Sequence, residues 1–313
     1  MTRVAPTPTS TPIPLPEPGR NVVLAGPGVF AAPFAGRLAG LRAFAAAGGL
    51  GVANTWGAKG VFDWDSPHHL GTCGLQARDF ELLGWAEADA IIAVGIHDDE
   101  SPRDRFALAP VFEVDPDRLG GLAGNSRAVG PPLINELYPR LAAVAQPGFV
   151  DERVPLHPAR AVADLGAALP AGGVVTAEPG IAGLWVARTF PTPAVATDGD
   201  RRVVVPGRRV PGAAAQVAAE AARAGRAAII VTTDPIDDET AAVYDRLAAE
   251  GTDVVLVVWR EGGRLGNVGE HRTQLDAAIA AVGASVVEVP VELALTELLL
   301  DAAGPVVAWN GLA

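Results

Sequence analysis

The sequence has little of several residue types, and each shortage excludes a class of protein. One cysteine among 313 residues, Cys73, excludes an intrachain disulfide and a multi-cysteine zinc site, and fits a reducing cytoplasm. No apolar run approaches the ~20 residues that cross a bilayer, and the start has no secretory signal, so no membrane association is predicted. A net charge of −12 disfavours nucleic acid as a partner, because phosphate backbones require a basic face.

What the sequence does contain is enough apolar material for large buried cores. Hydrophobic residues make up 49% of the chain and charged residues 19%, which argues against global disorder. A chain of 313 residues suggests two domains. Residues 1–20 alternate proline with threonine, serine and glutamate, and this composition predicts an extended linker.

From residue 21 onward, short apolar runs alternate with alanine-rich segments. Continuous apolar runs separated by helices indicate parallel sheets covered on both faces. We therefore predict an α/β fold of two three-layer parallel-sheet domains, with a Rossmann-like domain over 21–147 and a second domain over 148–313. Strands are expected at 21–25, 50–54, 90–94, 111–114, 173–176, 227–232, 253–258, 285–289 and 305–309. Helices are expected at 30–47, 76–87, 133–145, 181–188, 212–224, 238–250, 275–282 and 293–302.

Ligands of open α/β sheets bind at the carboxyl ends of the strands. In the first domain these ends predict binding loops at 26–29, 55–60, 70–74, 95–99 and 115–116. Their glycines would let backbone amides approach a phosphate, although many such turns carry glycine for geometry alone. The Gly26-Pro27-Gly28 turn is not a dinucleotide fingerprint.

The order of these loops is more specific than any one of them. LAGPGVF is followed by TWGAKG, a proline before LGTCG, then ADAIIAVG and a strand that ends in DPD. This succession resembles the central domain of thiamine-diphosphate enzymes of the acetolactate synthase and 2-oxo acid decarboxylase group. The matching residues are Gly26, Gly28, Thr55, Gly57, Lys59, Gly60, Pro67, Leu70, Gly71, Gly74, Ala88, Asp89, Val94, Gly95 and Asp115.

In that family the central domain carries FAD, ADP or no nucleotide, so the resemblance implies nucleotide contacts in these loops. His97 stands where flavin-binding relatives often carry an arginine, while Asp98, Asp99 and Glu100 beside it would repel a diphosphate. The candidate nucleotide-binding residues of the first domain are Gly26, Gly28, Thr55, Gly57, Lys59, Gly71, Gly74, His97 and Asp115.

The second half resembles the family's diphosphate-binding domain more faintly. Its opening segment, GGVVTAEPGIAGLWVARTF, matches at Thr176, Gly180, Trp185 and Ala187, whereas Glu178-Pro179 departs from the family pattern. The family holds Mg²⁺ and the diphosphate with a Gly-Asp-Gly motif and a later Asn-Asn pair.

In this sequence Thr233-Asp234-Pro235 and Trp259-Arg260 stand at those places. Mg²⁺ needs several oxygen ligands, and proline removes an amide donor, so the resemblance disfavours Mg²⁺. Asp234 and Arg260 are the candidates for contact with thiamine diphosphate, because an arginine could neutralise a phosphate without metal.

Enzymes of the family also need a pyrimidine domain, which supplies a glutamate that activates the cofactor. No part of this sequence resembles that domain, and residues 1–20 resemble the linker that follows it. We therefore expect a subunit of a thiamine-diphosphate-enzyme-type assembly that is not catalytic alone, in a homo- or hetero-oligomer with a pyrimidine-domain protein. One alternative is the large half of a split C–C lyase or 2-oxo acid decarboxylase completed by that protein. Another is a module that binds ADP or FAD.

One group of acidic side chains has a structural interpretation as well as a functional one. Asp234, Asp237, Asp238 and Glu239 could form a metal cluster. Asp237 followed by acids is, however, typical of a helix start, because the side chain caps the first amides and negative charge favours the helix dipole. We therefore expect these acids to open the helix over 238–250.

Other candidates have similar structural interpretations. His68 and His69 are expected in a solvated or nucleotide-facing loop, since no acidic partner stands at ligand spacing. Lys59 could meet a phosphate, but an exposed turn lysine is the expectation, and Cys73 is expected in the packing. The tryptophans at 56, 64 and 85 are expected in the core or at an interface.

Overall fold

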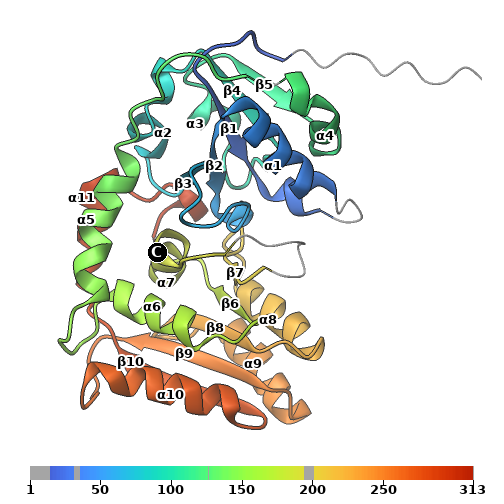
Figure 1. Ribbon diagram of the computed structural model, residues 1–313. Helices are drawn as coiled ribbons and strands as arrows, with labels where there is room; N and C mark the ends of the chain where they lie inside the picture. The colour runs from blue at the N-terminus through green and yellow to red at the C-terminus, as the bar shows by residue number, and fades with distance from the viewer. Residues whose placement is uncertain (1–14, 32–35, 126, 194–200, 313) are drawn as a thin grey trace, which may run out of the picture.

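Two five-stranded sheets, both entirely parallel, form the framework of the protein. The computed structural model describes residues 15–31, 36–125, 127–193 and 201–312. Figure 1 shows one sheet with its helices above the other. The predicted fold class is thereby confirmed, while residues 1–14 of the predicted linker lie outside the described residues.

The first sheet has the strand order β3-β2-β1-β4-β5. β1 and β4 are buried along their whole length, as their continuous apolar sequences predict. Leu41 and Phe44 of the first long helix pack on one face, and Phe80, Trp85 and Phe106 pack on the other. The elements are β1 (Asn21–Ala25), α1 (Gly36–Gly48), β2 (Gly51–Thr55), β3 (His69–Cys73), α2 (Asp79–Leu82), β4 (Ala90–Val94), α3 (Arg103–Phe106), β5 (Val111–Val114) and α4 (Leu119–Leu122).

The second sheet has the strand order β10-β9-β8-β6-β7. Small side chains such as Ala215 and Ala218 bring α8 close to one face, and Trp185 of α7 packs on the other. The elements are α6 (Pro158–Ala168), β6 (Val174–Ala177), α7 (Ile181–Thr189), β7 (Val203–Val204), α8 (Ala213–Arg223), β8 (Ala228–Thr233), α9 (Asp238–Glu250), β9 (Val254–Arg260), α10 (Val268–Ala280), β10 (Ala284–Pro290) and α11 (Thr296–Ala303).

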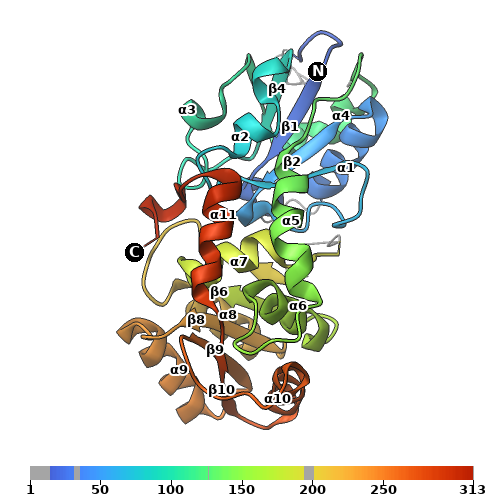
Figure 2. The same ribbon diagram turned by 90° about the vertical axis from the view of Figure 1, so that its left-hand side faces the viewer.

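Two helices run between the sheets and pack against the cores of both domains. α5 (Leu137–Phe149) and α11 lie side by side at one side of the molecule, as Figure 2 shows. Leu141 of α5 packs against cores of both halves. α5 also runs through the predicted division between residues 147 and 148, with Pro147 in its last turn. No helix among the described residues is long and apolar enough to span a membrane.

Three sequence predictions of secondary structure are wrong. The helix expected over 76–87 is only α2 and a 3-10 turn at Trp85–Glu87, because Gly84 adopts a left-handed conformation with φ 72° and ends the helix. The segment 70–74, expected as a loop, belongs mainly to β3, which pairs with β2 across a register shift. The strand expected at 305–309 is a single bridge between Val306 and Gln76, followed by a 3-10 turn.

The start of α9 confirms the predicted capping role of Asp237. Its Oδ1 accepts a hydrogen bond from the Thr240 amide at 2.9 Å. We expect Asp237→Ala to lower the free energy of unfolding by about 1 kcal/mol, measured by urea denaturation, because the amide loses its acceptor. Asp237→Asn keeps an acceptor and removes the charge, so it should stay within about 0.5 kcal/mol of the native protein. Equal losses in the two variants would contradict the capping role.

Candidate functional site

The glycine turn after β1 is occupied by a neighbouring loop. Gly26 and Gly28 donate their amides to the carbonyls of Val94 and Gly95, both at 2.9 Å. A Cβ atom built on Gly26 would lie 2.4 Å from the Gly95 oxygen, so only glycine permits this approach of two backbones. The glycines therefore serve loop packing, and their amides already have acceptors.

The loop after β2 binds a carboxylate of the chain itself. The Gly57 amide donates to Glu100 Oε2 at 3.1 Å, and any side chain at Gly57 would clash with Glu100. Glu100 is only 3% exposed, and burial raises the pKa of its carboxyl to about 7. From the second domain, Arg201 donates to the Gly57 carbonyl at 2.8 Å. Sequence reasoning treated Glu100 only as a repelling charge and missed this inward position.

The other candidates of the first domain are not gathered around one phosphate position. Thr55 ends β2, and Gly71 lies within β3. A Cβ atom on Gly74 would lie 2.4 Å from Ser101 Oγ, so that glycine also serves close packing. His97 is exposed in the loop after β4, and Asp115 caps a short turn by accepting from the Asp117 amide at 2.9 Å.

A cavity of about 300 Å³ does open beyond β4 and β5, but its lining is acidic. Asp98, Glu113 and Asp115 contribute to it, and the arginine present, Arg103, is already hydrogen-bonded to Glu113. Such a lining disfavours a diphosphate group, because like charges repel at close range.

The expectation of a solvated or nucleotide-facing histidine loop is wrong for His69. This residue lies in β3, with Nε2 3.1 Å from Asn54 Oδ1 and Nδ1 3.2 Å from the Trp64 carbonyl. Burial, with help from the nearby charge of Lys59, lowers the pKa of His69 to about 4. His68 is half-buried, and its Nδ1 lies 2.9 Å from the Leu50 carbonyl.

Lys59, expected as an exposed turn residue, is 2% exposed. Its Nζ lies 4.6 Å from the centroid of the Trp64 ring and has no hydrogen-bond partner in the part of the chain that the structure describes. Burial and then the charge of Arg188 lower the pKa of Lys59 to about 7. Cys73, Trp56 and Trp85 are buried as predicted. Trp64 is half-buried beside an interdomain cavity.

In the second domain, a cavity of about 290 Å³ lies at the carboxyl ends of β6 and β8. Glu178, the residue after β6, lines it, and Glu178 Oε1 accepts from the Ala215 amide in the first turn of α8 and from Thr240 Oγ1, both at 3.1 Å. Burial raises the pKa of Glu178 to about 6. A helix N-terminus suited to a phosphate therefore already holds a carboxylate.

Asp234 and Arg260 do not line this cavity. Arg260, at the end of β9, lies 3.6 Å from Asp234 and 2.5 Å from Glu288, so two carboxylates share one guanidinium at an exposed edge. Within the described ranges, no group of three or more histidine, cysteine or acidic residues is arranged to hold a metal. The residues present therefore do not fit a magnesium diphosphate.

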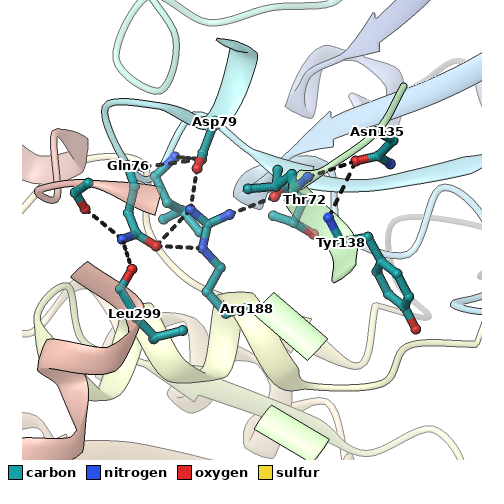
Figure 3. A network of polar contacts seen from close by, with 10 residues as sticks. Thr72, Gln76, Asp79, Asn135, Tyr138, Arg188 and Leu299 are labelled. Carbon is teal, nitrogen blue, oxygen red and sulfur yellow. Dashed lines mark hydrogen bonds and ion pairs between the residues drawn. The ribbon is translucent and has the colours of Figure 1, made fainter. Parts of the chain in front are cut away.

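The domains are joined by a buried polar network around Arg188, shown in Figure 3. Arg188 and Asp79 are both fully buried, and their ion pair measures 2.6 Å. The guanidinium also donates to Gln76 Oε1 at 3.0 and 3.1 Å and to the Thr72 carbonyl at 2.8 Å. Gln76 in turn donates to the Leu299 carbonyl at 2.7 Å. Sequence reasoning named none of these residues as a site, because their partners lie over a hundred positions apart.

Residues 17–121 match the family model described as "Thiamine pyrophosphate enzyme, central domain". Over this stretch, about a third of the chain, the protein is similar to that domain. The resemblance inferred from the loop order is thereby confirmed for the first domain. A comparison with curated proteins finds no match.

Among solved structures, the chain is similar to a protein from Mycobacterium smegmatis described as a "putative thiamin diphosphate-dependent enzyme". The TM-score is 0.61 at 17% sequence identity, and the match covers 87% of this chain. At this identity the likeness concerns the fold. The chain spans 61% of the length of that structure.

Proposed function

We propose that this protein is a non-catalytic subunit of a thiamine-diphosphate-enzyme-type assembly. The family match of residues 17–121 and the similar fold over 87% of the chain support membership of such an assembly. The absence of a catalytic role is inferred from one observation above all. Glu178 accepts from the first turn of α8 in the cavity that Thr233 and Pro235 also line, and these two residues stand in place of the glycines of the family's Gly-Asp-Gly motif.

Two further observations support this proposal. Arg260 is paired with Asp234 and Glu288, so it has no charge to spare for a phosphate. Asp237, which also lines the cavity, adds to the negative potential there and helps to raise the pKa of Glu178. The lining of this cavity holds two carboxylates, Glu178 and Asp237, and one arginine, Arg209, so its net charge is negative and opposes a dianionic diphosphate. The proposed partner is a pyrimidine-domain protein in the same cytoplasmic compartment.

Titration calorimetry tests the proposal directly. Thiamine diphosphate with Mg²⁺ is titrated into the purified chain, alone and mixed with a pyrimidine-domain chain encoded beside it. We expect a complex of the two chains by analytical ultracentrifugation and no cofactor binding in either sample. Cofactor binding that arises only in the mixture would establish the split enzyme instead, and the lack of any complex would remove the proposed partner.

The role given to Glu178 has its own test. We expect Glu178→Ala to bind inorganic pyrophosphate at least about tenfold more tightly than the native chain, because the α8 amides lose their internal acceptor and a negative charge disappears. Glu239→Ala removes an equal charge from an exposed position in the first turn of α9 and should change the affinity less than about threefold. Equal gains in the two variants, or none, would contradict the role of Glu178.

A further inference from the structure

A cavity of about 200 Å³ lies between the two domains, away from the carboxyl ends of the second sheet. Leu70 of β3, Leu141 of α5 and Leu299 of α11 are among its lining residues, and most of its surface is apolar. Concave, mostly apolar cavities with a few convergent polar groups are typical of small-molecule sites. α5 and α11 form one side of it, and Figure 3 shows its polar end around Arg188 and Thr72.

The polar end of this cavity has spare donor capacity. A guanidinium carries five N–H groups. Four of those on Arg188 are used, two toward Gln76, one toward Asp79 and one toward the Thr72 carbonyl. One N–H of Arg188 Nη1, the nitrogen that donates to the Thr72 carbonyl, therefore has no acceptor among the described residues.

The same end has an excess of positive charge. Asp79 balances Arg188, but Lys59 is buried against Trp64, a lining residue, and its Nζ has no partner among the residues that the structure describes. Among the described residues, the titratable groups that interact with Lys59 are Arg188 on α7 and His69 on β3. Asp79 is the ion-pair partner of Arg188. Arg188 disfavours the charged form of Lys59, and His69 is neutral near pH 7. A charged amine that is buried without a hydrogen-bond partner raises the free energy of the folded protein, and an anion bound near Lys59 would lower this cost.

We propose that this interdomain cavity binds a small monocarboxylate with an apolar body, its acidic head at the end formed by Trp64, Thr72 and Arg188, near Lys59. The apolar walls exclude a strongly hydrated ligand, and the single uncompensated charge matches one carboxylate rather than a diphosphate. The ligand would contact both domains, so its binding would also stabilise their junction. This inference does not depend on the proposed function.

Phenylacetate is a suitable probe, and phenylacetamide is its uncharged counterpart. Calorimetry at pH 6 should show saturable binding of phenylacetate at millimolar or lower concentration, and at least about tenfold weaker binding of phenylacetamide. At pH 7, binding should take up about half a proton, because the anion favours the charged lysine. Affinity should fall at least about tenfold from pH 6 to pH 9, where Lys59 is neutral.

Substitutions test the charge of Lys59 and the space in the cavity independently. Lys59→Met replaces the amine by an apolar side chain of similar length, so it should raise the melting temperature of the free protein. It should also abolish proton uptake and lower the affinity for phenylacetate at least about tenfold. Ala142→Phe should block the cavity, whereas Ala143→Phe, one position along α5 and exposed, should bind like the native chain. Equal binding of acid and amide, unchanged binding by Lys59→Met, or no saturable binding would each overturn the proposal.

Discussion

Replacing Arg188 by methionine is expected to lower the free energy of unfolding by about 3–5 kcal/mol. Arg188 of α7 is fully buried and pairs with the equally buried Asp79 of the first domain. Removing the guanidinium leaves the Asp79 carboxylate in the interior without a counter-charge, and it also removes the donors to Gln76 and Thr72. Urea denaturation followed by tryptophan fluorescence measures the loss. In the Arg188→Met variant, the two domains are also expected to unfold in separate transitions, because the network that it disrupts lies at their junction.

Two controls make the expected result specific. Arg208 and Asp99 form another pair between the same two domains, but the Arg208 side chain is 71% exposed. Arg208→Met should therefore cost at most about 1 kcal/mol. The double variant Arg188→Met with Asp79→Asn should recover part of the loss, because neither charge of the pair is then left and the asparagine oxygen still accepts from the Leu75 and Gln76 amides. If Arg188→Met lowers the free energy of unfolding no more than Arg208→Met does, the buried pair does not hold the domains together.

Glu100→Gln is expected to remove a loss of about 3 kcal/mol in the free energy of unfolding that Glu100 contributes between about pH 4.5 and 7. The folded protein holds a proton on Glu100 up to about pH 7, whereas the unfolded chain releases it near 4.5. At this site the native state therefore binds more protons in this window, and the contribution of Glu100 to the free energy of unfolding falls as pH rises through it. At about 1.4 kcal/mol per pKa unit, the total loss is about 3 kcal/mol.

Urea denaturation from pH 5 to pH 8 measures this effect. The glutamine variant should match the native protein near pH 5 and exceed it by about 3 kcal/mol at pH 8. The native profile also contains a smaller contribution of the same sign from Glu178, whose pKa is raised to about 6. His69, whose pKa is lowered to about 4, contributes with the opposite sign, and the variant should retain both contributions. Asp98→Asn, an exposed neighbour in the same loop, should leave the profile unchanged. If the free energies of unfolding of Glu100→Gln and the native chain change with pH in parallel, the Glu100 carboxyl is already ionised in the folded protein throughout this range.

Local sequence predicted most of the framework because its signals are local. The apolar runs NVVLA and AIIAV form β1 and β4 with the predicted bounds, and the acids after Asp237 open α9. The loop order pointed to the central domain that the family model confirms. β3 was missed because His69 and Gly71 interrupt its apolar pattern, and its strand character comes from pairing with β2.

The sequence by itself determined two parallel-sheet domains, the resemblance of the first to a thiamine pyrophosphate enzyme central domain, and the absence of Gly-Asp-Gly and Asn-Asn motifs from the chain. These rest on apolar periodicity, on loop order and on residue identity, all readable along the chain. Only the tertiary structure decided that Glu100 and Glu178 turn inward onto backbone amides and that Arg188 pairs with Asp79. It also decided that Lys59 is buried with no hydrogen-bond partner for its Nζ among the described residues. The physical reason is that burial and pairing of charges depend on tertiary packing, which brings together residues between 37 and 109 positions apart in the sequence.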